Sequence, residues 1–339
     1  MIKPIFKDMD LKCKCGSTCI RTAKKILENT NETFAPCTQC INPQLKKFSP
    51  LTQQIKLTTI DRDFGLCDCG KRHIDSVIAH ILKIMIDEGI KPPNSNLRKT
   101  CIPLINPAYD LQAAPYLREK SLIVLSPEFN KLCAERIIED VVEVKGVLMG
   151  DAHSTVGIKD SNYKPYVYDL LAGCDLRCDI VNSPCGPICI HKDQGEIHIE
   201  FPRKKNLKVA AVSNFIKKNY LENEFSVLDA TCGPGTLGIF SLKAGAQKVI
   251  FNDLWKPATN MTALNLESNG FQVEFFDEFL ENCMVASGKN FEVYHMDIRH
   301  LSESLDEKFD LCIIDTFPGV ENTDFIKAAQ KIAKDILVI

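Results

Sequence analysis

The sequence predicts an α/β fold in which a parallel sheet of five evident strands follows cysteine-rich and small α/β regions. From residue 203 onward, apolar strand-like runs alternate with helical runs, a pattern typical of parallel strands joined by right-handed crossovers. The 16 cysteines are concentrated earlier in the chain, in groups whose spacing is typical of metal binding. A chain of 339 residues is long enough for two or more such units.

Composition and charge predict an ordinary soluble protein of the cytoplasm. Hydrophobic residues make up 45% and charged residues 25% of the chain, and a net charge of −3 gives no overall attraction to nucleic acid. A local basic patch is still compatible with that balance. The N-terminus carries charges where a signal peptide needs an unbroken apolar core, and no apolar run is long enough to span a membrane. We therefore expect no membrane partner, and the oligomeric state does not follow from the sequence.

Residues 1–100 are predicted to form a cysteine-rich, metal-binding region with one helix. Little hydrophobic periodicity precedes residue 74, so burial alone could hardly fold this segment, and metal crosslinks would supply what is missing. Apolar residues then recur at helical spacing from Ile74 to Ile90. The linker KPPNSN at 91–96 ends that helical unit.

Two shorter regions are predicted next. Residues 101–173 form a small α/β region, in which SLIVLSPEF indicates a strand and turn, residues 130–142 a helix, and VEVKGVLMGD another strand. Residues 174–202 hold further cysteines and then the alternating EIHIEF, which is typical of a strand or hairpin arm. The amphipathic run LKVAAVSNFIKKN then begins the last region, 203–339.

The cysteines fall into two groups that can bind metal. The first holds a Cys-x-x-Cys pair and two Cys-x-Cys-Gly turns, which either complete one four-thiolate site or contribute to two. The second places four thiols within 16 residues. Zinc and an iron–sulfur cluster both fit these thiolates, and the spacing does not choose between them. The predicted ligands are Cys13, Cys15, Cys37, Cys40, Cys67 and Cys69 in the first group, and Cys174, Cys178, Cys185 and Cys189 in the second.

The C-terminal region is predicted to alternate strand and helix. Parallel strands place a ligand at their carboxyl ends, so the residues that follow each strand are the candidates for a site. The predicted strands are 227–231, 248–253, 291–297, 309–317 and 336–339, and the predicted helices are 236–243, 258–268 and 324–333.

A glycine-rich turn follows the first of these strands. Gly233-Pro-Gly235-Thr-Leu-Gly238 matches the G-x-G-x-x-G pattern, in which glycines let the backbone approach a nucleotide closely. Asp253 ends the next strand, where a carboxylate can accept hydrogen bonds from ribose hydroxyls. The pattern alone fits a dinucleotide or an adenosyl ligand.

Three further carboxylates favour S-adenosylmethionine. Asp229 lies directly before the turn, where it would repel a pyrophosphate but can serve a sulfonium ligand that carries an amino group. Asp297 ends the third strand, a position from which it can accept from the adenine amine. Asp315 ends the fourth strand, where a transferase needs its acceptor.

The C-terminal region resembles class I S-adenosylmethionine-dependent methyltransferases, and among them the tRNA guanine methyltransferases that act on an exocyclic amine. The resemblance runs from about Phe201 to the end, in FPRKKNLKVAAV, LDATCGPGTLGI, NDLWKPATNMTALNLESNG and FDLCIIDTFPG. It implies a Rossmann-like methyltransferase sheet, whose two last strands are absent here or come from the segment before Phe201. It implies these cofactor-binding residues: Asp229, Thr231, Gly233, Gly235, Asp253, Leu254 and Asp297.

The resemblance also implies a catalytic carboxylate that acts as a base and an aromatic side chain that stacks on the substrate. Methyl transfer is an in-line displacement at a sulfonium carbon, so positioning and desolvation supply most of the rate. Asp315 would face the methyl acceptor and take the proton of a nitrogen nucleophile. Phe317 would stack on a planar substrate.

The acceptor is predicted to be RNA, with a tRNA base amine favoured. The DTFPG motif favours it, as does a basic stretch near the site entrance that comprises Lys204, Lys205, Lys208, Lys217 and Lys218. The acidic balance of the chain favours instead a protein side chain or a small metabolite. A non-catalytic metal- and nucleoside-binding protein and a nicotinamide-dependent oxidoreductase are the remaining hypotheses.

Overall fold

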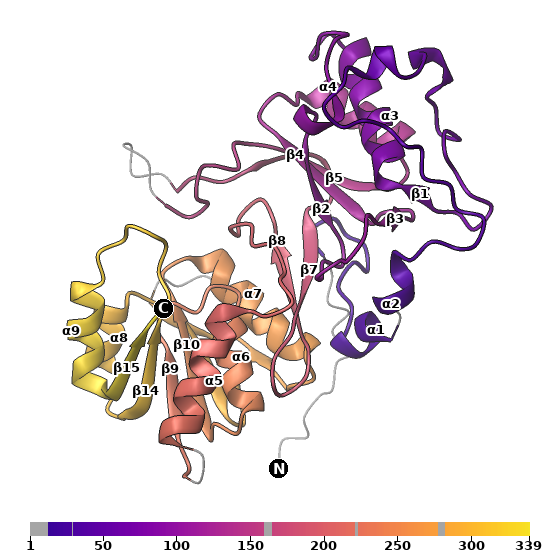
Figure 1. The fold of residues 1–339 in the computed structure, drawn as a ribbon. Helices are drawn as coiled ribbons and strands as arrows, with labels where there is room; N and C mark the ends of the chain where they lie inside the picture. The colour runs from indigo at the N-terminus through magenta and orange to yellow at the C-terminus, as the bar shows by residue number, and fades with distance from the viewer. Residues whose placement is uncertain (1–12, 29, 159–164, 221–222, 277–281) are drawn as a thin grey trace.

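The computed structural model describes residues 13–28, 30–158, 165–220, 223–276 and 282–339. An N-terminal α/β unit and a C-terminal α/β unit lie on either side of a β-hairpin (Figure 1). The charged N-terminus, on which the expectation of no signal peptide depends, lies outside the described residues. In the described part of the chain, no helix is both long and apolar enough to cross a membrane.

The C-terminal unit is built on a seven-stranded sheet in the order β11-β12-β13-β10-β9-β14-β15. The five predicted strands are parallel, and the chain crosses over on both sides of the central strand β9. A crevice outside the carboxyl ends of such strands is the usual ligand site of an open α/β sheet. These strands are β9 Ser226–Asp229, β10 Lys248–Asp253, β13 Phe291–His295, β14 Phe309–Ile314 and β15 Ala333–Val338.

Two strands that were not predicted extend this sheet beyond β13. They are β11 Glu274–Phe275 and β12 Cys283–Gly288, and both pair antiparallel. The segment before Phe201 adds no strand to this sheet, and within the described residues its other edge ends at β15. The two additional strands therefore come from inside the region, on the edge opposite to β15.

Helices cover both faces of this sheet. Neighbouring strand residues point to opposite faces, so Val227 packs in the core under α5, α6 and α7, while Leu228 packs in the core under α8 and α9. The result is a three-layer α/β/α unit (Figure 1). The helices are α5 Leu207–Asn219, α6 Thr236–Lys243, α7 Lys256–Ser268, α8 Ile298–Ser304 and α9 Thr323–Ile332.

The N-terminal unit has a four-stranded mixed sheet in the order β2-β4-β5-β6. One hydrophobic core runs from Phe34 to Val147, so the predicted boundary at residue 100 cuts through a single core. The main elements are β2 Ile102–Ile105, β4 Leu122–Ser126, β5 Val144–Met149, β6 Asp169–Gly173, α3 Ile74–Asp87 and α4 Lys131–Asp140. Shorter ones are α1 Ala23–Leu27, α2 Thr30–Thr33, β1 Arg72–His73, β3 Tyr116–Leu117 and the 3₁₀ turns Leu51–Gln53, Leu57–Thr59 and Leu97–Lys99.

The hairpin between the units consists of β7 Leu176–Val181 and β8 Ile188–Asp193. Backbone hydrogen bonds join β7 to Ala108 of the N-terminal unit. On the other side, Asn265 of α7 and Asn269, which directly follows α7, donate to and accept from the backbone of β8, as a neighbouring strand would. The predicted strand EIHIEF does not form, because residues 196–201 pair with no other strand. The hairpin lies upstream of it.

Candidate functional site

The site lies at the carboxyl edge of the central strands, around the turn between β9 and α6. Gly235 has φ +88° at the start of α6, a left-handed conformation that favours glycine. At Gly238, a Cβ would come within 2.2 Å of the Phe251 ring, so only glycine lets α6 pack this closely on β10. The turn thus brings the N-terminus of α6 to the strand ends, as a nucleotide-binding turn requires.

Asp229 ends β9 beneath this turn and is fully buried. Its Oδ2 accepts from the Gly238 amide at 2.8 Å, whereas its Oδ1 is buried without a hydrogen-bond partner among the described residues. Burial, with a smaller contribution from the nearby carboxylates of Asp315 and Asp253, raises the pKa of Asp229 to about 8. An unpartnered acceptor at this depth fits a positively charged donor from a ligand.

Asp253 ends β10 and shapes the other wall of the turn. Its two oxygens accept from the amides of Gly233 and Trp255, each at 2.8 Å, and burial raises its pKa. The next residue, Leu254, leaves 59% of its surface exposed although it is apolar. A carboxylate beside an uncovered aliphatic side chain is an arrangement that suits a ribose and its base.

Asp297 follows β13 and is already engaged by its own helix. It caps α8, accepting from the Arg299 amide, and it pairs with the Arg299 guanidinium at 2.9 and 2.5 Å. This pairing lowers the pKa of Asp297. Its predicted contact with adenine stays a prediction, and the helix cap gives this residue a structural role as well.

Asp315 is held at the end of β14 by Thr231. The Thr231 hydroxyl donates to the Asp315 carbonyl at 3.0 Å and accepts from the Asp315 amide at 2.8 Å, which ties the glycine turn to the acceptor side. The Asp315 carboxylate receives Lys208 Nζ at 2.8 Å. Burial raises the pKa of Asp315, and Lys208 opposes that shift. Thr231 therefore positions Asp315.

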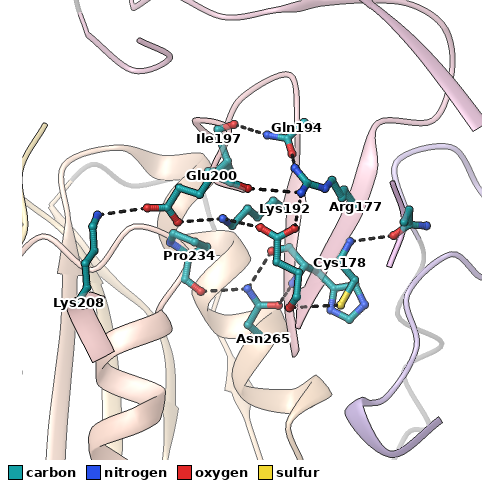
Figure 2. A network of polar contacts seen from close by, with 12 residues as sticks. Arg177, Cys178, Lys192, Gln194, Ile197, Glu200, Lys208, Pro234 and Asn265 are labelled. Carbon is teal, nitrogen blue, oxygen red and sulfur yellow. Dashed lines mark hydrogen bonds and ion pairs between the residues drawn. The ribbon is translucent and has the colours of Figure 1, made fainter. Parts of the chain in front are cut away.

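Lys208 also begins a chain of alternating charges that leads into the hairpin (Figure 2). It contacts Glu200 at 3.2 Å, Glu200 contacts Lys192 at 3.2 Å, and Lys192 contacts Asp179 at 2.9 Å. Lys192, and to a lesser degree Lys208, lower the pKa of Glu200 to about 2. Asp179 in turn pairs with Arg177. These ion pairs therefore connect Asp315, the candidate catalytic residue, to the buried core of the hairpin. Glu200 was not predicted as a site residue.

Phe317 lies beside a histidine that the sequence did not single out. The ring centroids of Phe317 and His198 are 5.7 Å apart in an edge-on arrangement, and His198 Nδ1 is buried without a partner among the described residues. Burial lowers the pKa of His198, which favours the neutral form of the ring. Gly157 also lies close to the Phe317 ring, since a Cβ at this position would be in van der Waals contact with it. Residues from the two preceding regions thus complete the acceptor side.

The predicted basic stretch divides in two. Lys204 and Lys205 are exposed in the segment before α5, and so is Phe201, which is 60% exposed. Lys217 and Lys218 are about 14 Å farther along α5 than Lys208, by the rise of an α-helix. Their end of the helix adjoins the start of β14, because Tyr220 donates to the Asp310 carbonyl. These two lysines are therefore not at the site entrance.

Eight cysteines form two four-cysteine groups, and one of these groups joins cysteines from both predicted groups. Cys37, Cys40, Cys67 and Cys69 converge, so each Cys-x-Cys-Gly turn contributes to a different group. The other group comprises Cys13, Cys15, Cys19 and Cys174; in chain order it is the first group, and the Cys37 group is the second. The predicted grouping of Cys174 with Cys178, Cys185 and Cys189 does not occur, because Cys178 and Cys189 point into the core under α1 and Cys185 lies exposed at the hairpin turn. Cys19 was missed.

Comparison with protein families supports the methyltransferase resemblance. Residues 210–293 match the family model described as Ribosomal protein L11 methyltransferase (PrmA). The matched segment contains the glycine turn together with β9, β10 and Asp253. The predicted resemblance to class I methyltransferases is thereby confirmed. No curated protein matches the chain.

Several solved structures are similar to the chain. TYW2 of P. horikoshii, in complex with MeSAdo, is 18% identical with a TM-score of 0.43, and the match covers 76% of this chain and 78% of that one. The tRNA m1G37 methyltransferase of M. jannaschii is 15% identical with a TM-score of 0.37, covering 68% and 58%. Trm5b of Pyrococcus abyssi is 16% identical with a TM-score of 0.37, covering 62% and 55%. The chain thus spans less than two thirds of the last two proteins.

Proposed function

We propose that the protein is an S-adenosylmethionine-dependent methyltransferase that acts on RNA, with a base amine of tRNA as the favoured acceptor. The observation that carries the proposal is the convergence of Asp229, Asp253 and Asp315 around one glycine turn at the carboxyl edge of the sheet. Asp229 has an unpartnered oxygen for the cofactor's ammonium, and Asp253 borders the ribose position. An ammonium group stabilises the ionised form of Asp229 and a pyrophosphate destabilises it, so the site favours S-adenosylmethionine over a dinucleotide.

In the proposed reaction, the chain's own residues bind, orient and take up a proton. Asp229 and Asp253 would hold the cofactor so that its methyl group points toward β14, where Asp315 lies. Lys208 contacts Oδ2 of Asp315, so Oδ1 is the oxygen that can accept the proton of an attacking amine. Phe317 and His198 would contact the faces and edges of a planar base. Positioning of the two reactants supplies most of the rate in such a displacement.

RNA is favoured over a protein or small-metabolite acceptor by the exposed segment that precedes α5. Phe201 is exposed there and Lys204 and Lys205 follow it in the chain, which supplies an aromatic stacking surface and cations that can contact phosphates. Because the net charge of the whole chain is −3, this patch must act locally. A protein side chain needs no such aromatic surface.

The direct test is methyl transfer from labelled S-adenosylmethionine to bulk tRNA, to unmodified tRNA transcripts and to a protein extract. We expect label in the tRNA fraction, with a rate that falls steeply as salt rises. Asp253→Ala is expected to weaken cofactor binding about 10- to 100-fold, because hydrogen bonds to a charged group are worth about 1.5–3 kcal/mol. The control Asp306→Ala alters an exposed loop acid. Label in protein alone would overturn the RNA assignment, and cofactor binding without transfer would favour a non-catalytic protein.

The raised pKa of Asp229 predicts that cofactor binding depends on pH. With a pKa of about 8, Asp229 is mostly protonated at pH 7 in the free protein, and binding an ammonium group requires its ionised form. Affinity is therefore expected to rise about tenfold per pH unit between about pH 5.5 and 7, with release of a proton. Titration calorimetry in buffers of different ionisation enthalpy measures this release directly.

The raised pKa of Asp229 also determines whether the free energy of unfolding rises or falls with pH. The folded protein binds the Asp229 proton more tightly than the unfolded chain, so ionisation works against the fold as pH rises from about 4 toward 8. Asp229→Asn keeps an acceptor for the Gly238 amide and removes the titration. The groups that face Asp229 are Asp253, Asp315 and Lys208, and they remain in this variant. An unchanged pH dependence in Asp229→Asn would contradict the assignment.

A further inference from the structure

We propose that each four-cysteine group binds a single zinc ion. The ion bound by Cys13, Cys15, Cys19 and Cys174 would hold the segment around Cys13 against the cofactor loop, which we define as Asp253 to Trp255. In both groups, all four sulfur atoms lie within 4.8 Å of one another. One group joins Cys13 to Cys174 and the other joins Cys37 to Cys69, so the tertiary fold assembles both.

The sulfur–sulfur distances fit a mononuclear tetrahedral site. Four sulfurs at the Zn–S distance of about 2.3 Å stand about 3.8 Å apart. In the first group, Cys13 to Cys174 is 3.4 Å, Cys15 to Cys19 is 3.5 Å and Cys19 to Cys174 is 3.8 Å. These distances are far above the bond length of about 2.05 Å in a disulfide.

The second group has the same dimensions. Cys37 lies 3.5 Å from Cys67 and 3.6 Å from Cys40, and Cys40 lies 3.6 Å from Cys69. An iron–sulfur cluster would attach these cysteines to different irons with sulfide between them, which requires a wider set of ligands than four sulfurs that all lie within 4.8 Å. Zinc, which accepts four thiolates in a tetrahedral site, therefore fits this spacing, whereas a cluster does not.

The turns in the two groups are also shaped alike. In both Cys-x-Cys-Gly turns the glycine has φ +76°, and its amide donates to the carbonyl of the first cysteine at 2.8 Å. In the Cys-x-x-Cys turn, the amides of Cys37 and Gln39 donate to sulfur atoms at 3.3 and 3.4 Å. Amides directed at sulfur stabilise thiolate charge, which a metal site needs and a set of neutral thiols does not.

The first group lies against the segment that carries Asp253, the proposed ribose ligand. Cys13 and Cys174 are buried in a cluster with Met261 of α7 and Trp255. The Trp255 amide donates to Asp253 Oδ1, and its ring nitrogen donates to the Glu196 carbonyl at 2.8 Å. Lys14, between two ligands, pairs with Glu196 and with Asp193. A zinc ion here would therefore brace Trp255, and through it Asp253.

The metal content of the full-length protein tests the first part. Elemental analysis after anaerobic purification is expected to find two zinc ions per chain, and cobalt substitution to give the visible bands of tetrahedral thiolate coordination. Cys15→Ser and Cys40→Ser should each leave one zinc ion, whereas Cys185→Ser, an exposed cysteine outside both groups, should leave two. Iron with a cluster absorbance, or no metal in the wild-type protein, would overturn the proposal.

The coupling to the cofactor loop rests on the proposed function, and a second measurement tests it. Calorimetry with S-adenosylhomocysteine is expected to show affinity about tenfold weaker in Cys15→Ser and unchanged in Cys40→Ser and Cys185→Ser. Circular dichroism checks that Cys15→Ser remains folded. Equal affinity in all three variants would overturn the bracing role. If the wild-type protein binds no cofactor, the proposed function fails while the zinc count still stands.

Discussion

Replacing Asp315 with asparagine is expected to lower the rate of methyl transfer by about 10²–10⁴-fold while leaving cofactor affinity within a few fold of the wild type. The amide keeps the size of the carboxylate but cannot take the proton of an attacking amine. The contacts of the Asp315 backbone with Thr231 do not involve the side chain, so the loop itself should be preserved. Single-turnover transfer to tRNA and calorimetry with S-adenosylhomocysteine separate the two quantities.

A matched control is available in α9. Asp324 lies exposed in this helix and pairs at the surface with Lys327, so Asp324→Asn should leave both rate and affinity unchanged. Lys208→Met removes the cation that opposes the raised pKa of Asp315, so the activity should then require a higher pH. A rate for Asp315→Asn equal to that of the wild type would show that the proton leaves by another route.

The largest expected effect on stability lies in the N-terminal unit. Arg72 and Glu143 form a fully buried, two-pronged ion pair with distances of 2.7 and 2.5 Å, and Arg72 also donates to the Asp61 carbonyl. Glu143→Ala leaves the guanidinium buried without its counter-ion, which should lower the free energy of unfolding of this unit by about 3–5 kcal/mol. Chemical denaturation followed by circular dichroism measures the change.

Two comparisons separate this effect from a general loss of charge. Glu119 is exposed and pairs with Lys120 at 3.6 Å, so Glu119→Ala should change the free energy of unfolding by less than about 1 kcal/mol. The double replacement Arg72→Met with Glu143→Leu removes both charges and should recover most of the lost stability. If Glu143→Ala proves no more damaging than Glu119→Ala, the burial of the pair contributes little.

Local sequence patterns were sufficient for the elements of the C-terminal sheet. Strands such as β10 are continuous apolar runs, and glycine and acidic residues follow them at positions that a nucleotide site requires, so Asp229, Gly233 and Asp253 could be named from the sequence. The strands β11 and β12 could not be predicted, because a two-residue strand and a strand with a register shift leave no clear periodic signal.

Alternation alone misled in the segment EIHIEF. Its pattern is that of a strand, but a strand forms only where a neighbouring strand supplies hydrogen bonds. Residues 196–201 pair with no such strand. The extended segment instead delivers His198 and Glu200 to the acceptor side. The predicted basic stretch divided for a similar reason, since the ten residues from Lys208 to Lys217 span most of α5.

The sequence by itself determined the class of fold, the glycine turn with its flanking carboxylates, and the presence of thiol groups suited to metal. The tertiary structure alone decided which groups meet across long stretches of chain: Lys208 with Asp315, His198 with Phe317, and Cys174 with Cys13. The physical reason is that secondary structure and turns depend on neighbours within a few residues, whereas a charge pair or a ligand set depends on how separate elements pack.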